Sequence, residues 1–160
     1  MLFSQFPPFS LNSQWNKLQG YALDIAVGPN NEVYKINKDD ERLYKLSGSS
    51  WVMESPLRAQ SIAVGPSKVL RVDYVTGSLY LKESSWARIG QDNASDVGIG
   101  DEGSIFIVSK ADDGWKGKTV QKYVSAQWEQ QRIQCLTSSS RITVDKAGSP
   151  WVVSLNGFIA

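Results

Sequence analysis

The chain repeats one pattern of apolar and polar positions. A short segment of branched and small residues opens each repeat, at 24–28, 61–65, 96–100 and 141–145. After a tight turn comes a β-branched or aromatic run, at 33–36, 69–72, 105–108 and 150–153. A third run follows at 43–46, 79–82, 120–123 and 158–160. Short runs separated by Gly, Asn, Asp and Ser are typical of antiparallel strands joined by hairpins. No helical periodicity appears, so the sequence predicts an all-β fold.

Tryptophan recurs in phase with this pattern. Trp15, Trp51, Trp86 and Trp128 follow one another at intervals of 35 to 42 residues, which is the length of a β-propeller blade. The pattern predicts a small β-propeller of about four four-stranded blades, with a packing role for the four Trp residues. The first strand of the first three repeats is rich in Gly and Ala, which suits the crowded innermost position. We expect the bulky residues of the next strand to pack between blades: Tyr34, Leu70, Phe106 and Trp151.

The two ends of the chain complement each other in strand number. The chain opens with a Trp-bearing strand at 15–18 that has no three strands before it, and it ends with three strands that lack their Trp-bearing fourth. The sequence therefore predicts an N-terminal arm, 1–14, and a propeller, 15–160, in which the Trp15 strand completes the last blade and closes the ring. Closure would leave no open edge. The same complementarity also allows a head-to-tail homo-oligomer.

The repeat resembles a known one. The order of Trp, a spacer, Ile-Ala-Val-Gly at 25–28 and 62–65, and then Val-Tyr-x-Ile and Leu-Tyr-x-Leu is similar to the tectonin β-propeller repeat of tectonin-type lectins and related intracellular adaptors. The likeness spans 15–160, is strongest in the first two repeats, and weakens in the fourth, where Asp145 replaces the glycine. Tectonin lectins usually close with more than four blades. The resemblance implies binding of glycans or protein partners without catalysis.

Composition excludes several classes of protein. The 160 residues carry 17 Lys and Arg, 16 Asp and Glu, and no His, so imidazole-based catalysis and His-ligated metals are excluded. The near-zero net charge gives no field for nucleic acid. The single cysteine, Cys135, allows no internal disulfide. The longest apolar run, 105–108, is too short to cross a membrane, and no signal-peptide pattern opens the chain. We expect a cytoplasmic or non-classically secreted protein that does not insert into membranes.

One loop carries candidate binding residues. The connections at 109–118 and 133–140 are longer than the others, and Trp115 lies outside the strand pattern with four charged neighbours: Asp112, Asp113, Lys116 and Lys118. An aromatic face with polar neighbours can stack on a sugar or anchor a protein, so these five residues form the predicted ligand site. The alternative is that Trp115 folds back over its own loop. Acidic clusters such as 39–41 favour turn chemistry over calcium binding, so no metal and no cofactor is expected.

Two functions remain open. A non-catalytic, lectin-like carbohydrate-binding propeller follows from the tectonin likeness and the loop chemistry. The alternative is a protein–protein interaction scaffold within a larger assembly, which the uneven loops and the arm at 1–11 favour. Phe3, Phe6 and Phe9 of this arm could dock into a partner's groove or pack on their own blade. A pair of carboxylates could in principle hydrolyse glycosides, but nothing in the sequence holds two at the required separation, so we expect no enzyme.

Replacement of Trp115 by Ala should weaken ligand binding and leave the free energy of unfolding nearly unchanged, because the side chain is expected to recognise ligand and not to support the blades. Retention on immobilised glycans and urea denaturation would measure the two quantities. Equal loss of binding and stability would show that Trp115 packs on its own loop.

Overall fold

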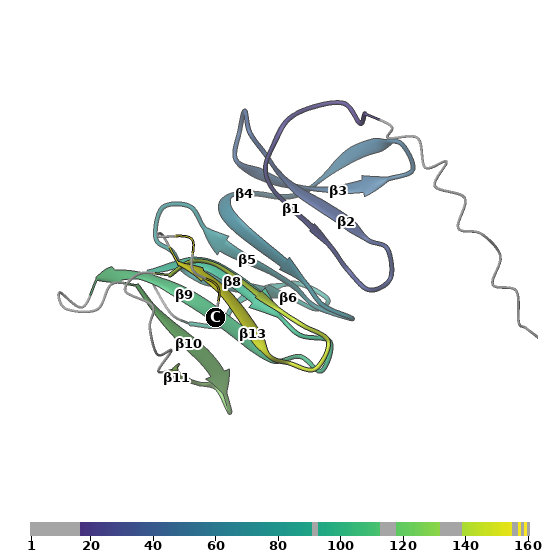
Figure 1. Ribbon diagram of the computed structural model, residues 1–160. Helices are drawn as coiled ribbons and strands as arrows, with labels where there is room; N and C mark the ends of the chain where they lie inside the picture. The colour runs from purple at the N-terminus through teal and green to yellow at the C-terminus, as the bar shows by residue number, and fades with distance from the viewer. Residues whose placement is uncertain are drawn as a thin grey trace, which may run out of the picture.

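The computed structural model describes residues 17–90, 93–112, 118–131 and 139–154, together with Gly157 and Ile159. These residues form antiparallel β-structure and contain no helix, and hence none that could cross a membrane (Figure 1). The all-β prediction is confirmed. The strands are β1 (Ala22–Val27), β2 (Val33–Asn37), β3 (Arg42–Ser47), β4 (Ser50–Val64), β5 (Val69–Asp73), β6 (Leu79–Lys82), β7 (Trp86–Arg88), β8 (Ala94–Ile99), β9 (Ile105–Asp112), β10 (Lys118–Val124), β11 (Gln127–Gln131), β12 (Ser139–Val144) and β13 (Pro150–Ser154).

The strands fall into four successive units. The first unit contains β1, β2, β3 and the first part of β4, and the second contains the rest of β4 with β5, β6 and β7. The third is the sheet of β8 to β11, and the fourth is the hairpin of β12 and β13 with one isolated bridge between Val153 and Ile159. In Figure 1 the units follow one another from the purple first unit to the green and yellow third and fourth. Trp15 lies outside the described residues, so closure of a four-blade ring stays a prediction.

Strand β4 joins two units without a turn, which the sequence pattern did not predict. Its first part pairs with β3, with Val52 opposite Lys45, and its last part pairs with β5, with Ala63 opposite Leu70. The register shifts between these parts, around Pro56, which has no N–H to donate. The chain therefore leaves one sheet and enters the next as one continuous strand, and the first seven strands form a single sheet.

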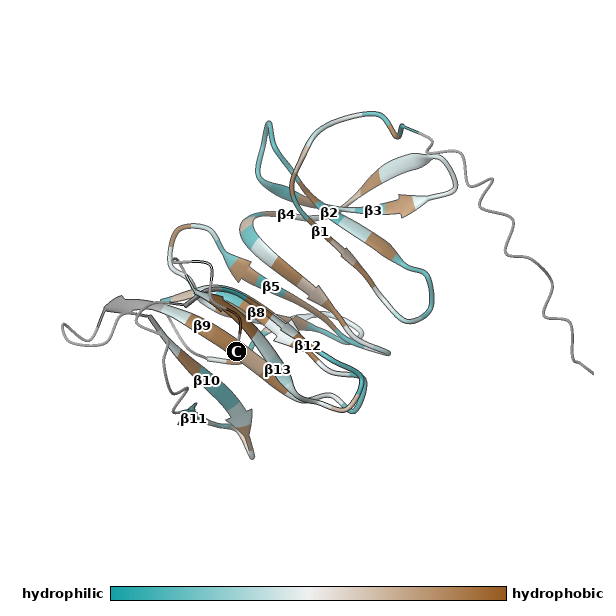
Figure 2. Cartoon of the chain, in the orientation of Figure 1, coloured by the Kyte–Doolittle hydropathy of each residue, from teal (hydrophilic) through white to brown (hydrophobic). Residues whose placement is uncertain are grey.

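Apolar residues gather at each junction between units. One cluster lies between the first and second units, another between the second and third, and a third between the third and fourth. Figure 2 shows hydrophobic positions on the strands and hydrophilic ones on the connecting turns. Tyr34, Leu70 and Phe106 each lie in one cluster and are at most 3% exposed, as expected for packing between blades. Trp151 was expected to pack in the same way, but it is 52% exposed because no described unit follows the fourth.

Glycine in the inner strands allows the units to approach closely. A Cβ on Gly28 would lie 2.6 Å from Cγ1 of Val64, and one on Gly65 would lie 2.9 Å from Cδ1 of Ile99. A branched side chain of each unit thus packs directly on the glycine backbone of the unit before it, a distance that a real Cβ would prevent. At the third junction a Cβ on the equivalent Gly100 would lie 3.0 Å from Cγ1 of Val144, and one on Gly98 would lie 2.9 Å from Cγ2 of the same residue. The Gly-rich segments predicted to be innermost therefore set the spacing between units.

The three described repeat Trp residues, Trp51, Trp86 and Trp128, lie in the first part of β4, in β7 and in β11. Trp86 and Trp128 are partly buried against the apolar clusters, and the ring of Trp128 lies 5.0 Å from that of Tyr123. The indole N–H of Trp51 donates to the Gln19 carbonyl at 3.2 Å, and the Lys35 ammonium lies 4.7 Å from its ring centre. These placements are those of packing residues, and their contribution to stability is tested below.

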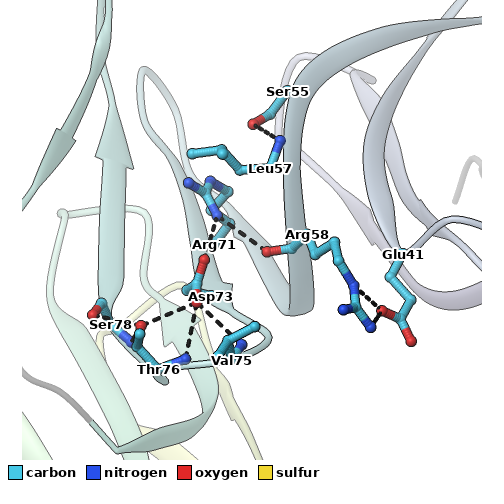
Figure 3. A network of polar contacts seen from close by, with 9 residues as sticks. All are labelled: Glu41, Ser55, Leu57, Arg58, Arg71, Asp73, Val75, Thr76 and Ser78. Atoms are coloured by element: carbon cyan, nitrogen blue, oxygen red, sulfur yellow. Dashed lines mark hydrogen bonds and ion pairs between the residues drawn. The ribbon is translucent and has the colours of Figure 1, made fainter.

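Arg71 in β5 of the second unit is the equivalent of Lys35 in β2 of the first unit. Its fully buried guanidinium lies 4.2 Å from the ring centre of Tyr80 and 5.3 Å from that of Trp86, so cation–π contacts replace hydrogen bonds on part of the group. Its Nη1 lies 3.7 Å from Asp73 Oδ2 and 3.4 Å from the Arg58 carbonyl (Figure 3). Burial lowers the pKa of Arg71. The contact to Arg58 ties the second unit to the continuous strand.

Replacement of Trp86 by Ala should lower the free energy of unfolding by about 3 kcal/mol, near the lower end for a large aromatic residue because the ring is only partly buried. Urea denaturation measures this change. Val75→Ala is the matched control, because Val75 is 72% exposed, and it should change stability by less than about 0.5 kcal/mol. A similar small effect for Trp86→Ala would refute a packing role.

Candidate functional site

The inner strands of all four units border one cavity of about 590 Å³. β1, the end of β4, β8 and β12 each contribute a stretch of backbone and short side chains to its wall. β13 and Ile159 complete the lining on the side of the fourth unit. The cavity therefore lies where the axis of a propeller would run and extends between the first and fourth units. Concave sites of this size are typical of ligand pockets.

The residue that opens each inner strand bonds to the next unit. These equivalent residues are Asp24, Ser61, Asp96 and Arg141. Asp24 Oδ2 accepts the amide of Ile62 in the second unit at 3.1 Å, and Asp96 Oδ2 accepts the amide of Ile142 in the fourth at 2.7 Å. The Ser61 hydroxyl donates to Asp96, which joins the second unit to the third. A side chain thus fastens each inner strand to the one after it.

Arg141 makes the fourth of these links. Its Nη2 donates to Asp24 Oδ1 at 3.0 Å, and its Nε lies 3.8 Å from Asp96 Oδ2. The guanidinium therefore connects the fourth unit to the first across one end of the cavity. Its side chain is 60% exposed, whereas that of Asp24 is nearly buried. The carboxylates of Asp24 and Asp96 are thereby engaged with donors of the protein itself.

Of these two carboxyls, that of Asp96 is the more deeply buried. Burial raises its pKa, although its hydrogen-bond donors and Arg141 act in the opposite direction. The pKa shift of Asp73, outside the cavity, has the opposite sign. Burial acts to raise this pKa, but hydrogen bonds from Thr76 and Val75 hold it below its usual value. The two carboxyls therefore have opposite effects on the pH dependence of stability.

The sides of the cavity are apolar. Ile25 and Val27 extend from β1, and Trp151 and Val153 extend from β13. We call these four residues the split core. Ile25 is 59% exposed, although its equivalent in the second unit, Ile62, is buried. The split core thus exposes large apolar side chains on two facing sheets, beside a charged pair at one end.

Trp151 has a fixed orientation in this site. Its indole N–H donates to Asp145 Oδ2 at 3.0 Å, and the Ser149 amide donates to Oδ1 of the same carboxylate at 2.9 Å. These bonds hold the pKa of Asp145 below its usual value. Because its polar edge is satisfied by Asp145, the indole presents its apolar surface to the cavity.

The residues of the predicted loop site lie mostly outside the described part of the chain. Trp115, Asp113 and Lys116 are outside it, as is Cys135. Asp112 ends β9 and Lys118 begins β10, where their backbones pair with each other. The ligand role of these five residues stays a prediction. Among the described residues no three His, Cys, Asp or Glu side chains are grouped to hold a metal ion.

Comparison with known proteins establishes the fold alone. The sequence matches no protein-family model and no curated protein. The chain is similar to the solved structure of TolB from Acinetobacter baumannii, with a TM-score of 0.63 and 13% identity over 88% of this chain and 43% of that one. It is also similar to a streptogramin B lyase, with a TM-score of 0.57 and 15% identity over 84% of this chain and 48% of that one.

A third similar structure is described as YCF48 bound to D1 peptide, with a TM-score of 0.54 and 15% identity over 87% of this chain and 48% of that one. The chain spans about half the length of these proteins. They share a β-propeller-like architecture with it, and none of the three is a tectonin protein. The chain therefore has an all-β, β-propeller-like fold, and the tectonin resemblance stays a prediction.

The carboxyls of Asp96 and Asp73 should give opposite pH dependences of stability. The folded-state pKa of Asp96 lies above its usual value of 3.8, so the difference in unfolding free energy between wild type and Asp96→Asn should fall as pH rises above 3.8. The folded-state pKa of Asp73 lies below 3.8, so the difference between wild type and Asp73→Asn should fall as pH drops below 3.8. Urea denaturation across a pH series measures both, and differences of the same sign would contradict the assignments.

Proposed function

We propose that the chain is a non-catalytic protein-interaction module whose recognition surface is the split core. One observation carries the proposal: side-chain positions that are buried or partly buried at the three junctions between units are exposed in the first and fourth units and face a shared cavity. An exposed apolar patch with a polar rim is typical of a protein-binding surface. Arg141 and Asp24 supply such a rim at one end.

The engagement of the carboxylates supports binding over catalysis. Asp24 and Asp96 each accept a backbone amide and contact Arg141. A general acid or base needs access to substrate, and these groups already hold the inner strands together. A structure of this fold described as bound to a peptide supports the idea that such an architecture can hold a protein segment. We therefore place the ligand's apolar side chains against Ile25 and Trp151.

A lectin-like function is the second candidate, and Trp151 favours it. The half-exposed indole is held by Asp145 and borders a cavity that also contains Thr143 and Asp101. An aromatic face beside polar groups is suited to stacking on a sugar ring. The aliphatic wall formed by Ile25 and Val27 offers a sugar's hydroxyl groups no hydrogen bonds, which is why the protein-binding role is the first candidate.

The two candidates differ in the ligand that the cavity selects. A displayed peptide library and a panel of immobilised glycans would be presented to the same chain. We expect bound peptides rich in aromatic and branched residues, with affinity at least about tenfold weaker for Ile25→Lys because a charge would enter an apolar contact. Val75→Lys, on an exposed residue that does not line the cavity, should bind as wild type does.

Either of two results would contradict the protein-interaction role. The first is peptide binding that Ile25→Lys leaves unchanged. The second is retention on a glycan that free sugar reverses and Trp151→Ala abolishes, which would establish the lectin-like function at this site.

A further inference from the structure

The three internal junctions use equivalent positions. The earlier unit of each pair supplies two residues of its second strand: Tyr34 and Ile36, Leu70 and Val72, or Phe106 and Val108. The later unit supplies two residues of its inner strand: Ile62 and Val64, Val97 and Ile99, or Ile142 and Val144. Each junction therefore combines one second-strand pair with one inner-strand pair. The same pairing predicts that the inner-strand positions of the first unit and the second-strand positions of the fourth unit also form a junction.

The split core contains one pair of each kind. Ile25 and Val27 occupy the inner-strand positions of the first unit, and Trp151 and Val153 occupy the second-strand positions of the fourth. They are the two halves of a fourth junction. Their exposed fractions are 59%, 61%, 52% and 37% in that order. The halves do not meet, because the cavity of about 590 Å³ lies between them.

Closure within the chain would have to bend three close-packed junctions. A Cβ on the inner-strand glycine of each would lie within 3.0 Å of the next unit's branched side chain, so these junctions have little room to tighten. The similar propeller-like structures are about twice as long as this chain. These two observations favour an arrangement in which the four units form part of a larger ring.

We propose that a second copy of this chain completes the fourth junction at each end. Trp151 and Val153 of one copy pack on Ile25 and Val27 of the other, and the reverse contact forms at the opposite side. The arrangement has two-fold symmetry and closes on itself. Its eight units lie within the usual range for propellers. The split core also has the composition of an obligate homodimer interface, which resembles a domain core divided in two.

Side-chain size supports this pairing. Asp145 stands where the three earlier units have a glycine, so a side chain occupies the place at which those glycines let the next unit approach. The indole of Trp151, larger than Leu70 or Phe106 at the equivalent position, fills the greater distance.

The mass of the chain in solution tests the proposal directly. Light scattering across a concentration series should give twice 17.7 kDa. A mass of 17.7 kDa at every concentration would overturn it. The proposal rests on the protein-interaction role, since it names the partner. A monomer that still binds peptides through Ile25 refutes only the second copy, whereas a monomer without such binding refutes both.

A charge pair then tests which surfaces meet. Ile25→Glu and Val153→Lys should each weaken dimerisation at least about tenfold, because each places a charge in both contacts. Mixed together, they should form a heterodimer with one native contact and one contact that joins opposite charges. Val75→Lys is the control and should dimerise as wild type does. Dimers that tolerate Val153→Lys would overturn the proposal, because they would join two first units.

Folding of the variants is checked independently. Ile25 and Val153 are exposed in the single chain, so neither substitution should change the circular dichroism spectrum or the urea midpoint of the monomer. If a variant fails to fold, the wild-type mass still decides whether two copies associate.

Discussion

The packing of a branched side chain on the glycine of the preceding unit determines the arrangement of this protein. A small antiparallel sheet with two apolar faces is not stable alone, and each unit here covers one face with its neighbour. Because Val64 and Ile99 contact glycine backbone, the inner strands come close enough for the larger residues behind them to form a continuous cluster. The junction is thus a unit of stability that recurs along the chain, as in other repeat architectures.

Hydrogen bonds between neighbouring inner strands fix their positions relative to one another. The inner strands have no neighbour to pair with on the axial side, and Asp24 and Asp96 meet this need in part by accepting amides from the following units. Burial of a carboxylate opposes ionisation, as the raised pKa of Asp96 shows. The contacts nevertheless fix the register of one unit against the next, which a purely apolar junction would leave less well defined.

The repeat pattern was sufficient to predict the inner strands, the all-β fold and the burial of Tyr34, Leu70 and Phe106, because periodicity reports which face of a strand is apolar. It did not predict the exposure of Trp151, since a pattern states which face needs a neighbour and not whether a neighbour exists. The continuous course of β4 through Pro56 was missed for a related reason: pairing partners, and not local sequence, decide where one sheet ends.

Trp115 is an aromatic residue outside the repeat, and for that reason the sequence pattern predicts it as a ligand residue. The residues of the split core follow the repeat pattern, and their equivalents in the other units lie in the apolar clusters at the three junctions. In the first and fourth units these positions are exposed by 37% to 61%, because no other described unit covers them. The proposed recognition surface therefore consists of the same residue types that form the internal junctions. This apolar character is the physical reason for proposing a protein segment before a sugar as its ligand.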